Sequence, residues 1–227
     1  FQILNCCPRP LISPAVKPFL IDGHIHLYPP EVEGKVQTFV DDYRPFANQF
    51  LRIDPPKTIG SNHYFAEAGI NYIRFCLNLP VANRTSDPDR VMKINQFALN
   101  IQKISEGAIF SLGSINPHNN ILHIAKHLEW IKENGLFGIK LHPVDLSAFQ
   151  AFDPTDPLYF PIYRKIGELG LTLLFHCGAS QLNPTSIFNA TPAKIAEIAG
   201  KFPDLNIVAA HLAGASILNY DTSEIKA

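Results

Sequence analysis

Short apolar runs that end in histidine recur along this chain and constrain its fold more than any other feature. Each run is unbroken in its apolar character, and Pro or Gly soon follows it. That pattern is typical of parallel strands that are buried on both faces. Five of the nine histidines lie at the carboxyl ends of such runs: His24, His26, His142, His176 and His211.

The first of these runs holds two histidines one residue apart. Side chains alternate between the faces of a strand, so the imidazoles of His24 and His26 are expected to point the same way. Two neutral imidazoles on one face can both reach a single metal ion. A His-x-His pair also arises by chance, so this pair alone does not establish a metal site.

Strand and helix patterns alternate along the rest of the chain. Asp87 suits the N-cap of a helix and Pro88 its first position, and this helix is expected to end at Gly107. The remaining expected elements are strands at 19–27, 70–77, 108–115, 136–142, 171–176 and 206–211, and helices at 121–134, 156–169 and 191–202. Such alternation predicts an α/β fold with a parallel sheet and right-handed crossovers.

An open doubly wound sheet and a closed barrel both fit this order of elements. No Gly-x-Gly-x-x-Gly motif follows an early strand, so nothing indicates dinucleotide binding. Histidines gathered at the carboxyl ends of strands fit the catalytic face of a (β/α)₈ TIM barrel better. The sequence therefore predicts a TIM barrel.

The bulk composition excludes several classes of protein. A net charge of -1 gives no sign of nucleic-acid or anionic-membrane binding, and no apolar run approaches the roughly 18 residues that span a bilayer. With 46% hydrophobic residues, the chain is expected to form one domain over 1–227, with 1–18 as an N-terminal extension that lacks a secretion signal. The four cysteines form no Cys-x-x-Cys motif, and reduced thiols in a cytoplasmic protein are the simplest account.

Four motifs together resemble the amidohydrolase superfamily. They are Asp22-Gly-His-Ile-His26, Gly138-Ile-Lys-Leu-His-Pro143, Phe175-His-Cys-Gly178 and Ala210-His-Leu-Ala-Gly214. Within the superfamily they resemble the amidohydrolase 2 branch, which contains metal-dependent hydrolases and non-oxidative decarboxylases. The resemblance covers roughly residues 19–214, in the expected order and on the expected elements.

This resemblance implies that His24, His26 and His176 bind one divalent metal ion. Zn²⁺ is the first choice for imidazole ligands, and Mn²⁺, Fe²⁺ or Co²⁺ also suit such a site. The ion would lower the pKa of a bound water from about 15.7 toward about 7. His211 would orient or deprotonate that water or polarise the scissile group, although a buried histidine with a purely structural role is the alternative.

The roles of the remaining polar residues follow less directly. In some relatives a lysine at this strand is carboxylated and bridges two metals, but one metal is more usual in this branch. Lys140 and His142 are therefore expected to bind substrate, with Lys140 holding a carboxylate or forming a local ion pair. Asp22 is expected to hydrogen-bond a neighbour on the first strand or to help orient the site residues. The other histidines are expected in loops or on a solvated helix face: His63, His118, His123 and His127.

One part of the family pattern is not matched. The family's fourth ligand is an Asp on the eighth strand, but only 13 residues follow Gly214, too few for two further units of about 25 to 30 residues. The barrel is therefore expected to be incomplete at the C-terminal end of this sequence. Asp221 falls one strand early and is not assigned as a ligand.

Several functions remain compatible with these residues. The first is hydrolysis of a C–N or C–O bond in a small molecule such as a lactone or cyclic amide. The second is non-oxidative decarboxylation of an aromatic or unsaturated acid, with Lys140 or Arg74 holding the carboxylate. A metal-dependent nuclease is less consistent, because that group carries Glu where Lys140 stands. A non-catalytic ligand-binding barrel is the alternative from another class, and a homodimer would be common for barrels of this type.

Overall fold

The computed structural model describes residues 20–29, 38, 73–82, 85–144, 151–178 and 189–213. From residue 73 onward the described strands and helices alternate as the sequence predicts, except that one expected strand is divided in two. The strands are β1 (Leu20–Ile25), β2 (Ile73–Asn78), β3 (Ile109–Ser111), β4 (Gly113–Ser114), β5 (Gly138–Leu141), β6 (Thr172–Phe175) and β7 (Ile207–Ala209). The α-helices are α3 (Pro88–Ile104), α4 (Ile121–Glu133), α5 (Phe160–Glu168) and α6 (Pro192–Lys201), and the 3₁₀ helices are η3 (Pro157–Tyr159) and η5 (Ala210–Ala213).

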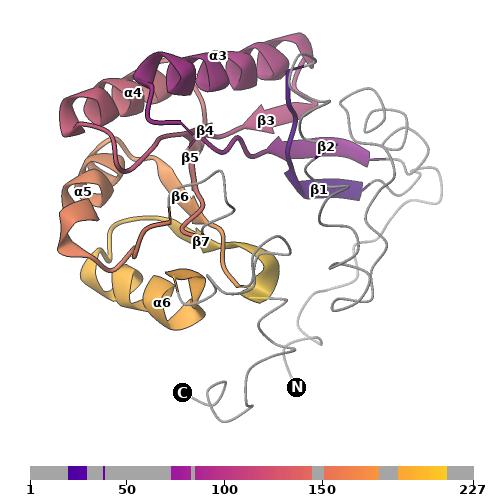
Figure 1. Cartoon of the computed structure of the whole chain (residues 1–227). Helices are drawn as coiled ribbons and strands as arrows, with labels where there is room; N and C mark the ends of the chain where they lie inside the picture. The colour runs from indigo at the N-terminus through magenta and orange to yellow at the C-terminus, as the bar shows by residue number, and fades with distance from the viewer. Residues whose placement is uncertain are drawn as a thin grey trace, which may run out of the picture.

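Each pair of neighbouring strands is parallel. The strands form two sheets, ordered β1-β2-β3 and β4-β5-β6-β7, and the helices form an outer layer around them (Figure 1). The expected strand at 108–115 is divided, because residues 109–111 pair with β2 whereas Gly113 and Ser114 pair with β5. Parallel strands place all their carboxyl ends at one edge, so the histidines that follow them are brought together.

The first helix begins as its sequence predicts. The Asp87 carboxylate accepts a hydrogen bond from the Asp89 N–H (3.0 Å), and Pro88 occupies the first turn. Gly107 follows the end of this helix with a φ of 89°, a conformation that glycine adopts without steric cost.

The helix expected at 156–169 has a different start. A 3₁₀ turn, η3, precedes α5, and the Tyr159 N–H donates to the Asp156 carbonyl (3.0 Å). The reason is Pro161, which has no N–H to give to the carbonyl four residues earlier. The prediction of one continuous helix was therefore wrong over its first turn.

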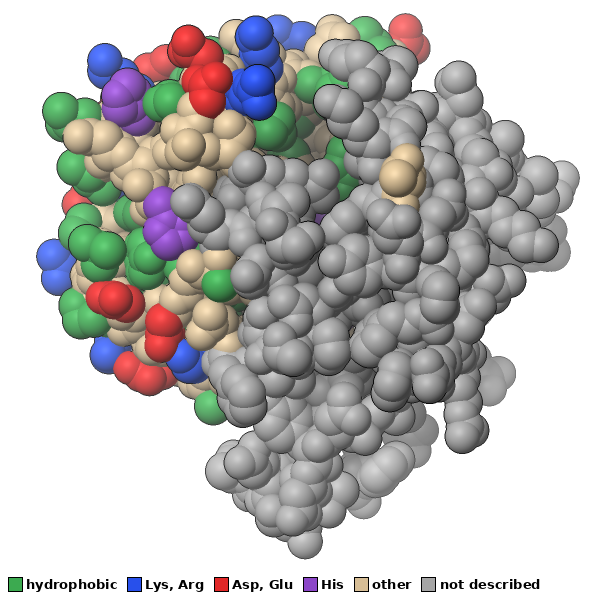
Figure 2. Space-filling model, viewed as in Figure 1, with side chains coloured by type: hydrophobic (Ala, Val, Ile, Leu, Met, Phe, Trp, Pro, Cys, Tyr) green, Lys and Arg blue, Asp and Glu red, His purple; other side chains and the backbone are tan. Residues whose placement is uncertain are grey.

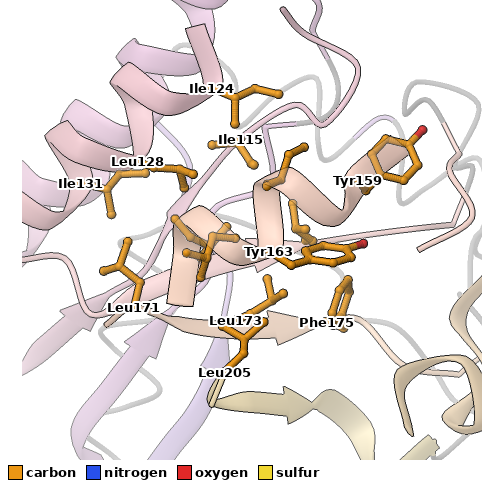
Figure 3. Packing of buried hydrophobic residues seen from close by; sticks show 14 of the residues in the cluster. Ile115, Ile124, Leu128, Ile131, Tyr159, Tyr163, Leu171, Leu173, Phe175 and Leu205 are labelled. Carbon is orange, nitrogen blue, oxygen red and sulfur yellow. The ribbon is translucent and has the colours of Figure 1, made fainter. Parts of the chain in front are cut away.

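The larger core lies between α4, α5 and the second sheet. Ile124, Leu128 and Ile131 of α4 are buried, and Figure 3 shows them on the side of the helix that lies toward Ile115. From α5, the Tyr163 ring packs against Phe175 with centroids 5.9 Å apart. This packing fixes β5 and β6, whose ends carry three of the candidate site residues.

The buried face of α4 differs from the predicted one. The apolar spacing of Leu122, Ala125, Leu128 and Ile131 predicts a core face that includes Leu122, but this side chain is 69% exposed. His127, expected in solvent, is only 6% exposed. Both differences have one cause: the core face is centred on Ile124 and Leu128, and His127 falls on that face by helical geometry.

The described surface carries charges of both signs. Lys, Arg, Asp and Glu side chains are interspersed among apolar and polar groups on the face in Figure 2. Within the part of the chain that the structure describes, no helix is long and apolar enough to span a bilayer.

Candidate functional site

Five imidazoles from four strand ends form a continuous row. The His24 ring lies 5.0 Å from that of His26 and 4.2 Å from that of His211, measured between centroids. His211 is 4.9 Å from His176, which stacks on His142 at 4.0 Å and 19°. The structure thus brings together all five histidines that the sequence singled out, and we call this cluster the histidine row.

The two histidines of β1 point to one side, as predicted. Their Nε2 atoms are 3.3 Å apart, and the Asp22 carboxylate accepts a hydrogen bond from the His24 N–H (3.1 Å). His26 Nδ1 lies 2.6 Å from the carbonyl oxygen of Leu79. Because a carbonyl can only accept, Nδ1 carries the proton, and Nε2 of His26 keeps its lone pair on the side of His24.

The strand that was expected to include His211 ends before it. β7 ends at Ala209, and His211 is exposed in η5 with a φ of 66°. A left-handed conformation is unfavourable for a residue with a side chain, and such strain persists where the surrounding structure imposes it. The consequence of this backbone geometry is that the His211 ring lies between His24 and His176.

Lys140 is buried beneath the histidine row. Its side chain is 0% exposed, and its Nζ has no hydrogen-bond partner among the described residues. Burial lowers the pKa of Lys140 from 10.5 to about 7. A buried amine without a hydrogen-bond partner is energetically costly, and this cost favours its neutral form.

Burial favours the neutral form of four imidazoles of the row, those of His24, His142, His176 and His211. Burial, followed by the charges of Lys140 and the neighbouring imidazoles, lowers the pKa of His24 to about 2. Burial also lowers the pKa of His142 and of His176 well below 6.5. The next cause is the neighbouring His176 for His142, and the charge of Lys140 for His176. Neutral imidazole is the form that binds metal ions.

The donor atoms fit a divalent metal ion in part. Zn–N bonds of 2.0–2.1 Å in a tetrahedral site place two nitrogens about 3.3 to 3.4 Å apart, and the Nε2 atoms of His24 and His26 are 3.3 Å apart. His176 Nε2 is buried without a hydrogen-bond partner among the described residues. Those residues contain no complete set of three or more His, Cys, Asp or Glu side chains arranged to hold an ion.

Other candidate residues lie outside the histidine row. Arg74 is exposed near the start of β2, where its guanidinium lies 5.5 Å from the Phe75 ring, at the opposite end of the strand from the site. The expectation that Arg74 could hold a carboxylate there was wrong. His118 contacts Tyr159 and Phe152, and His123 is exposed on α4. His63 and Asp221 lie outside the described residues.

The sequence reasoning missed two contributors at the end of β2. The Leu79 carbonyl binds His26, and the Asn78 side-chain oxygen accepts from the Leu27 N–H (3.1 Å). A signal was present, because Asn78 is a polar residue at the end of an apolar run. It was interpreted only as the point where the strand ends.

A parallel α/β fold with imidazoles at the carboxyl ends of its strands is the arrangement of a metal-dependent barrel enzyme. A family model described as amidohydrolase, of the amidohydrolase 2 type, matches residues 21–226. The chain therefore belongs to the amidohydrolase family, as its motifs predicted. No curated protein matches the sequence.

Solved structures with the same fold include one protein without an assigned function and two decarboxylases. A TIM-barrel protein from Bordetella bronchiseptica is 17% identical, with 88% of this chain and 69% of that chain covered and a TM-score of 0.67. For 2,6-dihydroxybenzoate decarboxylase from Rhizobium, the identity is 11%, the coverages are 92% and 72%, and the TM-score is 0.60.

The third structure is 5-carboxyvanillate decarboxylase from Novosphingobium aromaticivorans, solved with bound manganese and a nitrobenzoic acid. It is 15% identical, with coverages of 86% and 66% and a TM-score of 0.61. Together these structures show that the chain has the TIM-barrel fold that the sequence predicted.

Proposed function

We propose that this protein is a metal-dependent enzyme that removes CO₂ from a small carboxylic acid without oxidation. The observation that carries the proposal is the buried amine of Lys140, which has no hydrogen-bond partner among the described residues and lies close to the histidine row. Hydrolysis of a lactone or cyclic amide was the first interpretation of the sequence. Decarboxylation has better support, because two similar folds belong to decarboxylases.

The metal is one divalent ion held by His24, His26 and His176. Imidazole ligands suit Zn²⁺, and the manganese in the Novosphingobium decarboxylase makes Mn²⁺ the second ion to test. When bound, the ion would supply Lewis-acid polarisation of a substrate oxygen.

The residues around this site each take a distinct role in the proposal. Lys140 binds an anionic oxygen of the substrate, because a carboxylate would provide a partner that its buried amine does not find among the described residues. His142, stacked on His176, lines the substrate site beside it. His211 is exposed at the open side of the histidine row and can exchange a proton with solvent.

The reaction requires few groups. The bond between the substrate carbon and its carboxyl carbon breaks, CO₂ leaves, and the electron pair stays on the substrate carbon. His211 relays a proton from solvent water to that carbon, and this proton replaces the carboxyl group. The proposed substrate is a small aromatic or unsaturated acid in the cytoplasm, where the buried thiol of Cys177 would stay reduced.

The test is product analysis with the metal-loaded protein. A panel of hydroxybenzoic and unsaturated acids is incubated with Zn²⁺ or Mn²⁺, and CO₂ release is measured together with acid release from a matched panel of lactones. CO₂ release that is lost in His24→Ala and His211→Ala supports the proposal. Lactone opening without CO₂ would instead identify a hydrolase, and ligand binding without turnover a non-catalytic barrel.

A further inference from the structure

Hydrogen bonds join the end of β2 to three consecutive residues at the end of β1, which are Ile25, His26 and Leu27. The Leu79 N–H donates to the Ile25 carbonyl (2.9 Å), and the Leu27 N–H donates to Asn78 Oδ1 (3.1 Å). Between them, His26 Nδ1 donates to the Leu79 carbonyl (2.6 Å). The strands lie side by side (Figure 1), so these bonds extend their ladder past its regular end, to the point where the two histidines emerge.

The Asn78 side chain is itself held by a hydrogen bond to β3. Its side chain is 0% exposed, and its Nδ2 donates to Ser111 Oγ on β3 (3.3 Å). The Ser111 N–H in turn donates to Gln102 Oε1 on α3 (2.8 Å). A line of hydrogen bonds therefore runs from α3 through β3 and Asn78 to the residue that follows His26.

The side-chain oxygen of Asn78 serves a buried donor. Leu27 is only 6% exposed, so its N–H has little access to water and needs an acceptor from the protein. An apolar side chain at position 78 would leave that N–H unsatisfied and let the main chain at 26–27 turn away from β2. The Leu79 carbonyl would then no longer face His26 Nδ1.

We infer that Asn78 is a positioning residue for the candidate metal site. By anchoring Leu27, it holds His26 against the Leu79 carbonyl, which fixes the proton on Nδ1 and directs Nε2 toward His24. Partners of this kind orient metal-binding histidines and fix their tautomer. The inference rests on the proposed function, because it requires that His24 and His26 hold the ion.

Asn95 provides a matched control for the experiment. It is also 0% exposed, its Oδ1 accepts from the Ser114 N–H (2.8 Å), and its Nδ2 donates to the Ser114 carbonyl (2.9 Å). These bonds join α3 to β4 and do not reach β1. Asn78→Ala and Asn95→Ala thus each remove a buried amide with two bonds, but only the first affects His26.

The measurement is zinc affinity, obtained by competition with a chromophoric chelator. Asn78→Ala is expected to weaken binding by about 10- to 100-fold, with Asn95→Ala close to wild type. Equal affinity of Asn78→Ala and wild type, or an equal loss in both variants, would overturn the inference. If Asn78→Ala does not fold, Ser111→Ala replaces it, because it removes only the support of Asn78 Nδ2, and about a threefold loss is then expected.

A second readout separates this inference from the proposed function. In metal-free protein, ¹⁵N NMR of the His26 ring should show the Nδ1–H tautomer in wild type and Asn95→Ala, and a mixture in Asn78→Ala. That result without zinc binding would remove the metal site but keep the positioning role. An Nε2–H tautomer in wild type would overturn the positioning role even if zinc binds.

Discussion

Replacing Lys140 with methionine should stabilise the metal-free protein. The two side chains have similar length, but methionine removes an amine that is fully buried and has no hydrogen-bond partner among the described residues. A tenfold change in proton affinity corresponds to about 1.4 kcal/mol, so lowering the pKa of Lys140 from 10.5 to about 7 costs the charged form about 5 kcal/mol in the folded state. Local relaxation and water entry reduce this, and we expect a gain of at least about 2 kcal/mol at pH 7.

The direction in which stability changes with pH follows from the folded and unfolded pKa values of Lys140. Between the folded pKa of about 7 and the unfolded pKa of 10.5, the unfolded Lys140 binds a proton that the folded one does not. Wild-type stability should therefore rise with pH across this window, at up to about 1.4 kcal/mol per pH step. The advantage of Lys140→Met should be largest at pH 7 or below and should shrink toward pH 10.

The assay is urea unfolding in EDTA, followed by circular dichroism between pH 6 and pH 10. Lys126→Met, which replaces an exposed lysine of α4, is the control and should follow the wild-type curve. A Lys140→Met variant that is less stable than wild type at pH 7, or whose advantage does not change with pH, would refute the reasoning. That result would mean that the amine is charged and paired in the folded protein.

Three further predictions concern other parts of the fold and the metal. Partial burial opposes the change, but hydrogen bonds from Lys194 and Thr155 lower the pKa of Asp153 below 3.8. Asp153→Asn should therefore cost up to about 1 kcal/mol at pH 7, and thermal melts should show the difference shrinking as the pH falls below 3.8. Gly138→Ala should lower the free energy of unfolding by about 1–3 kcal/mol or more, because the new Cβ would lie 2.2 Å from a backbone oxygen of β6. Gly23→Ala is the control, since its Cβ would meet nothing within 4 Å. Equal urea midpoints for the two variants would contradict this packing. Zinc at a hundred times its Kd should stabilise the protein by about 2.7 kcal/mol, seen as a melting temperature that rises with zinc and falls with EDTA; an unchanged melting temperature would argue against the site.

The histidine positions could be predicted because they follow from strand periodicity and from the parallel order of the elements. Asp87 and Pro88 likewise mark the start of α3 by local chemistry alone. His127 could not be placed, because the helical pattern of α4 allows two faces and only packing against Ile115 and its neighbours selects one.

The finer geometry of the site depends on contacts between distant segments. The tautomer of His26 is set by a carbonyl 53 residues away. The lack of a hydrogen-bond partner for Lys140 among the described residues likewise depends on all the segments packed around it. The positive φ of His211 has no signature in the sequence, since non-glycine residues adopt it only where tertiary structure demands it. The α5 start could have been predicted from Pro161.

The division of the strands into two sheets gives the histidine row a mechanical role. His24 and His26 belong to the sheet of β1, whereas His176 follows β6 of the other sheet. An ion bound by all three would cross-link segments about 150 residues apart in the sequence, in the way that a disulfide closes a long loop. Loss of the ion would release that cross-link, so the same atoms that prepare the substrate would also tie the first strand of the barrel to its later ones.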